Sequence, residues 1–181
     1  MSHRVVEYWL GERTETLEDI VGPNPSVVFV GLNPSPVSVK KGHYHQGRLG
    51  KRFWQILRER QILSSCEGSE DDQLIPRFGI TDIVKRPTEN LRELKEEDFA
   101  EGRDKLHAKL VRWKPKLVCF IYKKAAEKFL NTSLTGMSGL LENRIGESKV
   151  FVMPPPYSRK AERTRIVDQL RDVISTLSSK G

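Results

Sequence analysis

Cysteine is scarce in this sequence: its 181 residues include only Cys66 and Cys119, and these do not form a Cys-x-x-Cys pair. A disulfide framework needs more cysteines, and an iron–sulfur cluster usually needs four thiolates, so neither is expected. Long apolar runs are missing too. No stretch is long enough to span a membrane, and the opening MSHRVVEYWL lacks the apolar centre of a secretory signal. We therefore expect a cytoplasmic protein with no membrane partner.

Internal repeats and low-complexity tracts are also absent, and the length suits one compact domain. We expect a single domain over residues 1–181, in which residues 1–21 form a helical extension, because Val5, Val6, Trp9 and Leu10 suggest an apolar helical stripe. Negative charge is in the minority: 31 Lys and Arg residues face 24 Asp and Glu residues, giving a net charge of +7. Such a balance suits an acidic partner, of which nucleic acid is the commonest.

Short apolar runs alternate with helical patterns along the chain. The apolar runs predict strands at 26–31, 78–84, 116–122 and 149–153, and the intervening patterns predict helices at 51–60, 97–113, 123–130 and 161–177, with a polar loop at 64–77. This order predicts an α/β fold, a three-layer α/β/α sandwich around a mostly parallel sheet of about four strands. Ligands bind such sheets at the carboxyl ends of the strands, so the chemistry is expected in the segments that follow them.

The first such segment is Gly-Leu-Asn-Pro-Ser-Pro at 31–36. An asparagine is no base, but its carbonyl oxygen can accept a hydrogen bond from water and hold that water for attack. Asn33 is therefore a candidate for catalysis by positioning. The alternative is a simple strand-to-turn connection, since Asn-Pro and Ser-Pro favour turns.

A second segment, GHYHQGRLGKRFW at 42–54, combines rings with basic residues. Tyr44 or His45 could stack on a base, while Arg52 and the start of a helix could hold phosphate. A metal site at His43 and His45 has little support, because no cysteine or carboxylate lies close by in sequence. The alternative is a polar surface loop.

The third segment, VMPPPYSRKAER at 152–163, begins with three stiff prolines. They would present Tyr157 and Arg159 as a rigid prong, able to fill the gap that a flipped base leaves in DNA. Ser158 and Lys160 could bind phosphate. The alternative is a linker between a strand and a helix.

Together these segments resemble the mismatch-specific uracil/thymine-DNA glycosylases of the uracil-DNA glycosylase superfamily. The first motif of that family is similar to Gly31–Ser35, and its Gly-His and Phe-Trp elements are similar to residues 42–43 and 53–54. A middle Thr-x-x-Val-x-Arg-x-Thr run matches residues 81–88, and a Pro-x-x-x-x-Arg loop matches residues 154–159. The four motifs occur in order and with similar spacing.

The resemblance implies a uracil-DNA glycosylase fold and roles for individual residues. Asn33 would position the attacking water, helped by Thr88. The base pocket would be lined by Leu32, Ser35, Ser38, Tyr44, His45 and Asp82. Tyr157 would be the wedge and Arg159 its partner, and the DNA-binding set would be Pro156, Tyr157, Ser158, Arg159, Lys160 and Arg52. The family uses no metal or other cofactor.

The sequence thus predicts a monomeric, monofunctional glycosylase that excises uracil from double-stranded DNA, with G:U mismatches as the expected substrate. Ser35 stands where the family has glycine, and Asp82 where relatives carry an amide or a lysine. A carboxylate there would resist a deprotonated leaving base, although a solvated loop acid is the interpretation we favour at this point. The alternatives are a glycosylase for hypoxanthine or xanthine, and a silent nucleic-acid binder.

Overall fold

The computed structural model describes residues 2–63, 70–74, 77–155 and 157–178. Its centre is a six-stranded sheet in the order β3–β5–β4–β6–β8–β7. The four inner strands are parallel, namely β5 (Phe78–Asp82), β4 (Val27–Gly31), β6 (Leu117–Phe120) and β8 (Ser148–Val152). They confirm the four strands predicted from apolar runs. The expected count of about four was too low, because β3 (Ile20–Val21) and β7 (Gly139–Ile145) add short antiparallel edges.

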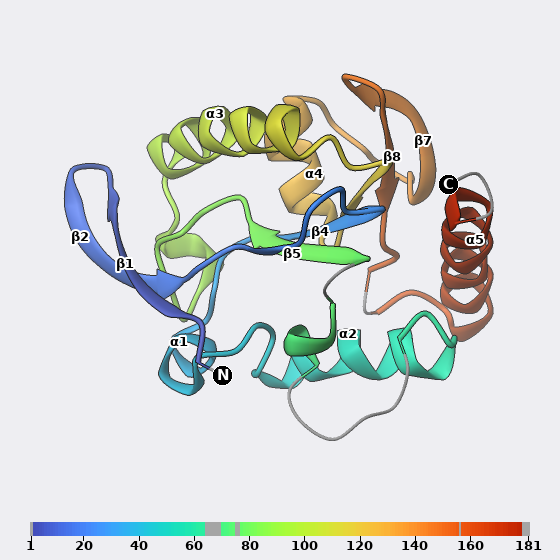
Figure 1. Ribbon diagram of the computed structural model, residues 1–181, viewed down its shortest axis with the longest axis horizontal. Coiled ribbons are helices and arrows are strands. Elements are labelled where there is room, and N and C mark those ends of the chain that lie inside the picture. The colour runs from blue at the N-terminus through green and yellow to red at the C-terminus, as the bar shows by residue number, and fades with distance from the viewer. Residues whose placement is uncertain (1, 64–69, 75–76, 156, 179–181) are drawn as a thin grey trace.

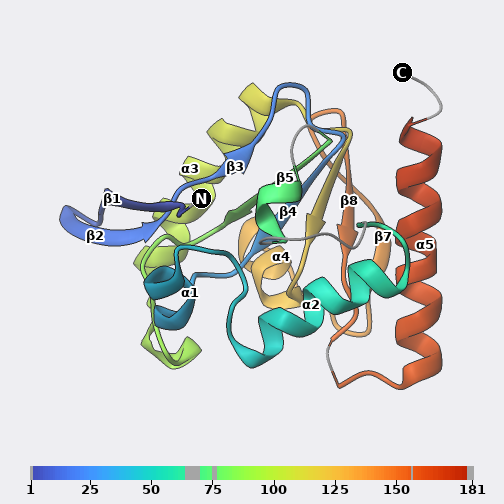
Figure 2. The same ribbon diagram turned by 60° about the horizontal axis from the view of Figure 1, so that its bottom comes forward.

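Helices cover both faces of this sheet, as Figures 1 and 2 show, so the predicted three-layer arrangement is confirmed. Alternate side chains of each inner strand point to opposite faces. Phe29, with its neighbours in register, packs towards α2 (Arg48–Glu59) and α5 (Lys160–Ser178). Val28 and its neighbours pack towards α3 (Glu96–Trp113) and α4 (Lys123–Leu130). Both faces of the parallel strands are therefore buried, as their continuous apolar runs require.

The N-terminal helical extension predicted for residues 1–21 was wrong. The segment forms a hairpin of β1 (Arg4–Trp9) and β2 (Glu12–Leu17), which projects from the body of the molecule in Figure 1. Leu10 and Gly11 make its turn with positive φ angles of 49° and 81°. A helix interior cannot contain that turn, and the alternating exposure of β1, which ends at the buried Trp9, follows a period of two.

Most of the polar loop predicted at 64–77, Cys66 included, lies outside the described residues. The part within them contains the short 3₁₀ helix η1 (Asp71–Gln73). Cys119 is buried in β6, where a strand thiol was expected. None of the described helices has the length and apolar character needed to cross a lipid bilayer.

Candidate active site

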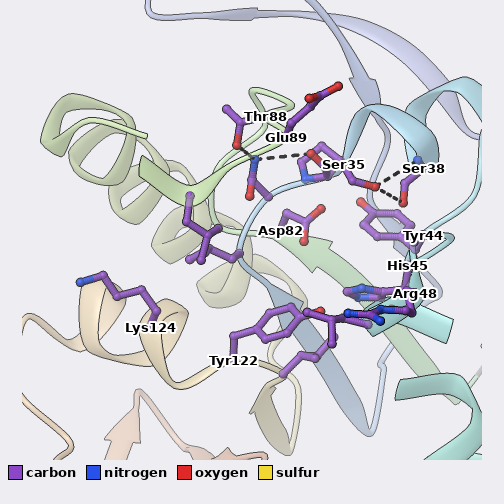
Figure 3. A pocket seen from close by; sticks show the side chains of 18 of the residues that line it. Ser35, Ser38, Tyr44, His45, Arg48, Asp82, Thr88, Glu89, Tyr122 and Lys124 are labelled. Carbon is purple, nitrogen blue, oxygen red and sulfur yellow. Dashed lines mark hydrogen bonds between the residues drawn. The ribbon is translucent and has the colours of Figure 1, made fainter. Parts of the chain in front are cut away.

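A cavity of about 660 Å³ opens at the carboxyl ends of β4, β5 and β6. The rule that ligands bind at the carboxyl ends of parallel strands, called the strand-end rule below, therefore predicted the position of this cavity from sequence. Tyr157 lines this cavity. So do all the residues predicted for catalysis and for the base pocket: Asn33, Thr88, Leu32, Ser35, Ser38, Tyr44, His45 and Asp82. Figure 3 shows many of these side chains around one space.

Asn33 follows the end of β4 and is held by its side-chain amide. Its Nδ2 donates to the Arg86 carbonyl oxygen at 3.0 Å and to Thr88 Oγ1 at 2.9 Å. These bonds fix the orientation of the amide, and no described residue donates to its Oδ1. The half-buried Asn33 thus presents a carbonyl oxygen that is held in place and can accept a hydrogen bond from water.

The two hydrogen bonds that Asn33 Nδ2 donates to Arg86 and Thr88 form a clamp on Asn33. Trp9 of the hairpin helps to hold this clamp in place. Asp98 at the start of α3 is fully buried and accepts bonds from Arg86 Nη2 at 2.5 Å and from Trp9 Nε1 at 2.9 Å. Burial opposes ionisation of Asp98, but these bonds and one from the backbone N–H of Lys95 lower its pKa to about 2. The ion pair therefore fixes Arg86, whose carbonyl oxygen holds Asn33.

Ser35 and Ser38 shape the mouth of the cavity. Ser35 caps the short helix α1 (Pro36–Lys41) by accepting from the Ser38 N–H at 3.2 Å. The two hydroxyl oxygens lie 3.0 Å apart, and Ser38 Oγ accepts from the Gln46 N–H at 3.0 Å. These bonds tie α1 to the loop that carries the next two pocket residues.

Tyr44 and His45 occupy that loop, between α1 and α2. Tyr44 is buried, and its hydroxyl donates to the Glu18 carbonyl oxygen at 2.9 Å. His45 has a positive φ of 56°, and its ring packs among Phe53, Trp54 and Tyr122. Burial lowers the pKa of His45 to about 4, so the ring is neutral at physiological pH.

The helix that follows begins earlier than the predicted residue 51. It starts at Arg48 after an extended Gly47. Gly50 in its first turn lies against the loop, where a Cβ would come within 2.5 Å of His45 Cα. The glycine thus permits the helix start to pack directly on the pocket loop.

Asp82 is not the solvated loop acid that was favoured from sequence. It is the last residue of β5 and only 4% exposed, and it lines the cavity. Its Oδ1 is enclosed without a hydrogen-bond partner among the described residues. Burial raises its pKa to about 7, with Lys85 opposing the rise and Asp19 adding to it. The sequence could not show this, because the groups that enclose Asp82 come from distant segments.

The predicted DNA-binding residues lie at and beyond the rim. Tyr157 is 88% exposed at the cavity edge, consistent with a prong, whereas Pro156 is outside the described residues. Ser158 and Arg159 follow it and lead into α5, and their carbonyl oxygens accept bonds from Arg163. The structure places Arg52 and Lys160 away from the cavity, in a neighbouring depression between α2 and α5. That depression has the basic lining Arg48, Lys51, Arg52, Arg60, Lys160 and Arg163.

Sequence reasoning missed the cavity residues that come directly after β6, of which Ile121 is the first. Tyr122, Lys123 and Lys124 follow that strand and line the pocket, and Figure 3 shows Tyr122 and Lys124. The signal was present, because the run predicted at 116–122 ends at Tyr122 and the strand-end rule applies there too.

Four side chains outside the cavity could be considered for a metal. His3, His43, Asp71 and Asp72 have potential ligand atoms within 4.8 Å of one another. Each imidazole already contacts a carboxylate: His3 Nε2 lies 2.5 Å from Asp72 Oδ1, and His43 Nδ1 lies 3.0 Å from Asp71 Oδ1. Asp71 also accepts from the Tyr44 N–H at 2.7 Å. These contacts explain the cluster without a metal, because they fix the loop between α1 and α2 that carries Tyr44 and His45.

Comparison with known proteins agrees with this geometry. The sequence profile of the uracil DNA glycosylase superfamily matches residues 18–175. A G/U mismatch-specific uracil DNA glycosylase of Schizosaccharomyces pombe is 30% identical over 148 residues. The match covers 74% of this chain and 44% of that protein, so the chain spans less than half the length of this relative.

Proposed function

Because this chain belongs to the uracil DNA glycosylase superfamily, we propose that it is a monofunctional DNA glycosylase that flips uracil out of double-stranded DNA and hydrolyses its bond to the sugar. G:U mismatches are the proposed substrate, which is also the specificity named for the S. pombe relative. The released products are the free base and an abasic site.

The observation that carries the proposal is the clamped amide of Asn33. Cleavage of the C1′–N bond passes through an oxocarbenium-like sugar, which needs a water molecule in line more than it needs a strong base. Asn33 Oδ1 can supply that position, because Arg86 and Thr88 hold the amide nitrogen on its other side. Thr88 is 7% exposed and orients Asn33.

Extrusion of the base must precede this cleavage, and the rim offers suitable groups for it. The exposed ring of Tyr157 stands beside the cavity and can occupy the space left in the base stack. The basic depression between α2 and α5, which includes Arg52 and Lys160, can bind phosphates near the rim. Extrusion would then place the base in the cavity with its sugar near Asn33.

The test is an assay on labelled duplexes that each carry one uracil, hypoxanthine or xanthine opposite a defined base, followed by alkali to cut abasic sites. Excision of uracil, fastest opposite guanine and visible only after alkali, is the expected result. Preferential excision of hypoxanthine or xanthine would show that one of these bases, and not uracil, is the substrate. Salt-sensitive DNA binding with no cleavage of any of the three would contradict the proposal and indicate a silent binder.

A further inference from the structure

No positively charged side chain among the described residues forms an ion pair with the carboxyl group of Asp82. Its enclosed Oδ1 has no hydrogen-bond partner among the described residues, yet the side chain lines the cavity. Gly31 makes this position possible, because a Cβ there would lie 2.0 Å from Asp82 Oδ1. Figure 3 shows Asp82 among the pocket side chains, towards Ser35 and Tyr44. A buried, unpartnered carboxylate is costly, so this arrangement favours the neutral acid.

Lys85 is the cation whose charge lowers the pKa of Asp82, but its ammonium group contacts other partners. Lys85 is 2% exposed, and its Nζ contacts Asp19 at 2.7 Å, the Leu17 carbonyl oxygen at 2.8 Å and the Tyr44 hydroxyl at 3.2 Å. An ammonium group has three donors, and these three contacts engage all of them. Lys85 therefore lowers the pKa of Asp82 only through space, while burial and the charge of Asp19 raise it to about 7.

The other titratable groups that face Asp82 are uncharged near neutral pH. Burial lowers the pKa of His45 to about 4, which leaves the imidazole neutral. Burial and the charge of Asp82 raise the pKa of Tyr122 to about 12, and that of Tyr44 is raised in the same way. The protonation of Asp82 is thus the one charge change that these facing groups undergo between pH 6 and 8.

The chemistry of the cavity makes that change consequential. A base that leaves the sugar carries away the bonding electrons and becomes anionic, chiefly on its carbonyl oxygens. A carboxylate beside it would repel the developing charge, whereas a carboxylic acid can donate a hydrogen bond to it. Its second oxygen can accept from the adjacent ring N–H, which suits the N–H and C=O edge that uracil, hypoxanthine and xanthine share.

From this geometry we propose that Asp82 binds the flipped base as a neutral carboxylic acid and donates a hydrogen bond to the base carbonyl on which negative charge develops. No proton is transferred from Asp82 and no covalent bond to it is formed. The inference rests on the proposed glycosylase function and adds that ionisation of Asp82 switches excision off.

The test compares the wild-type protein with Asp82→Asn and Asp82→Ala. Single-turnover excision of uracil from a G:U duplex is measured between pH 5.5 and 8.5, at protein concentrations that saturate the DNA. An amide keeps one donor and one acceptor in the same shape but does not titrate in this range. The wild-type rate should fall about tenfold between pH 6 and pH 8, as expected for an essential acid with a pKa of about 7.

Asp82→Asn should excise uracil faster than Asp82→Ala at pH 6 and show no fall in rate above that pH, whereas Asp82→Ala should be at least about tenfold slower than wild type at pH 6. A wild-type rate that is flat or rises with pH, or a fall that persists in Asp82→Asn, would overturn the inference while leaving the glycosylase proposal intact. Absence of any alkali-labile product from the wild-type protein, at every pH, would refute the proposed function and this inference with it.

Discussion

Asp82 should weaken the fold as the pH rises, and replacing it by asparagine should remove that cost. Burial raises the pKa of Asp82 from its ordinary value of 3.8 to about 7, so the native state binds more protons than the unfolded state between about pH 4 and pH 7. The free energy of unfolding therefore falls as the pH rises through that window. The accumulated cost at pH 8 is on the order of 4 kcal/mol, since each pKa unit corresponds to about 1.4 kcal/mol.

His45 acts in the opposite direction. Burial lowers the pKa of His45 from its ordinary value of 6.5 to about 4, so its contribution to the free energy of unfolding rises with pH between about 4 and 6.5. In the wild-type protein these two slopes oppose each other. Asp82→Asn loses the slope of Asp82 and keeps that of His45, so the variant should gain stability over wild type as the pH is raised from 4 to 8.

Urea denaturation of both proteins at several pH values, followed by circular dichroism, measures this difference. Asp104→Asn is the matched control, because Asp104 is exposed on α3 and its replacement should change stability by less than about 0.5 kcal/mol at any pH. Parallel stability curves for wild type and Asp82→Asn would refute the reasoning, since they would mean that Asp82 ionises as easily in the fold as outside it.

Three further predictions concern the wedge, the pocket floor and the clamp. Tyr157→Ala should slow excision from duplex DNA at least about tenfold but leave single-stranded uracil DNA nearly unaffected; equal losses on both substrates would exclude a wedge. Gly31→Ala should stay folded yet lose about tenfold or more in excision rate, because its Cβ would lie 2.0 Å from Asp82 Oδ1, and an unchanged rate would show that the position of Asp82 is unimportant. Asp98→Asn should cost about 3 kcal/mol in urea denaturation by leaving Arg86 without its buried partner, and a loss no larger than that of Asp104→Asn would contradict this account.

The sheet and the position of the cavity could be predicted because both follow from local patterns. The runs at 26–31 and 116–122 are continuously apolar and short, which is typical of buried strands in a parallel sheet. The segments that follow such strands lie at the same edge of the sheet. Asn33, which follows the first of these runs, was identified in this way before any contact was known.

The rest depends on contacts between distant segments. The N-terminal hairpin was missed because Val5, Trp9 and Leu10 suit a helical stripe as well as a strand, and the turn at Gly11 decides between them. The environment of Asp82 was missed because it depends on a distant residue. Lys85 is close to Asp82 in sequence, but its ammonium group pairs with Asp19, which precedes Lys85 by 66 positions. Local composition contains neither fact.

The most direct test of the central claim separates DNA binding from chemistry at Asn33. Wild type and Asn33→Ala are compared on one G:U duplex, by single-turnover excision with alkali and by equilibrium binding at the same salt concentration. We expect the rate of base loss to fall by at least about a hundredfold in Asn33→Ala while the dissociation constant changes less than about threefold, because the amide positions water and does not contact phosphate. Excision by Asn33→Ala at the wild-type rate would contradict the account.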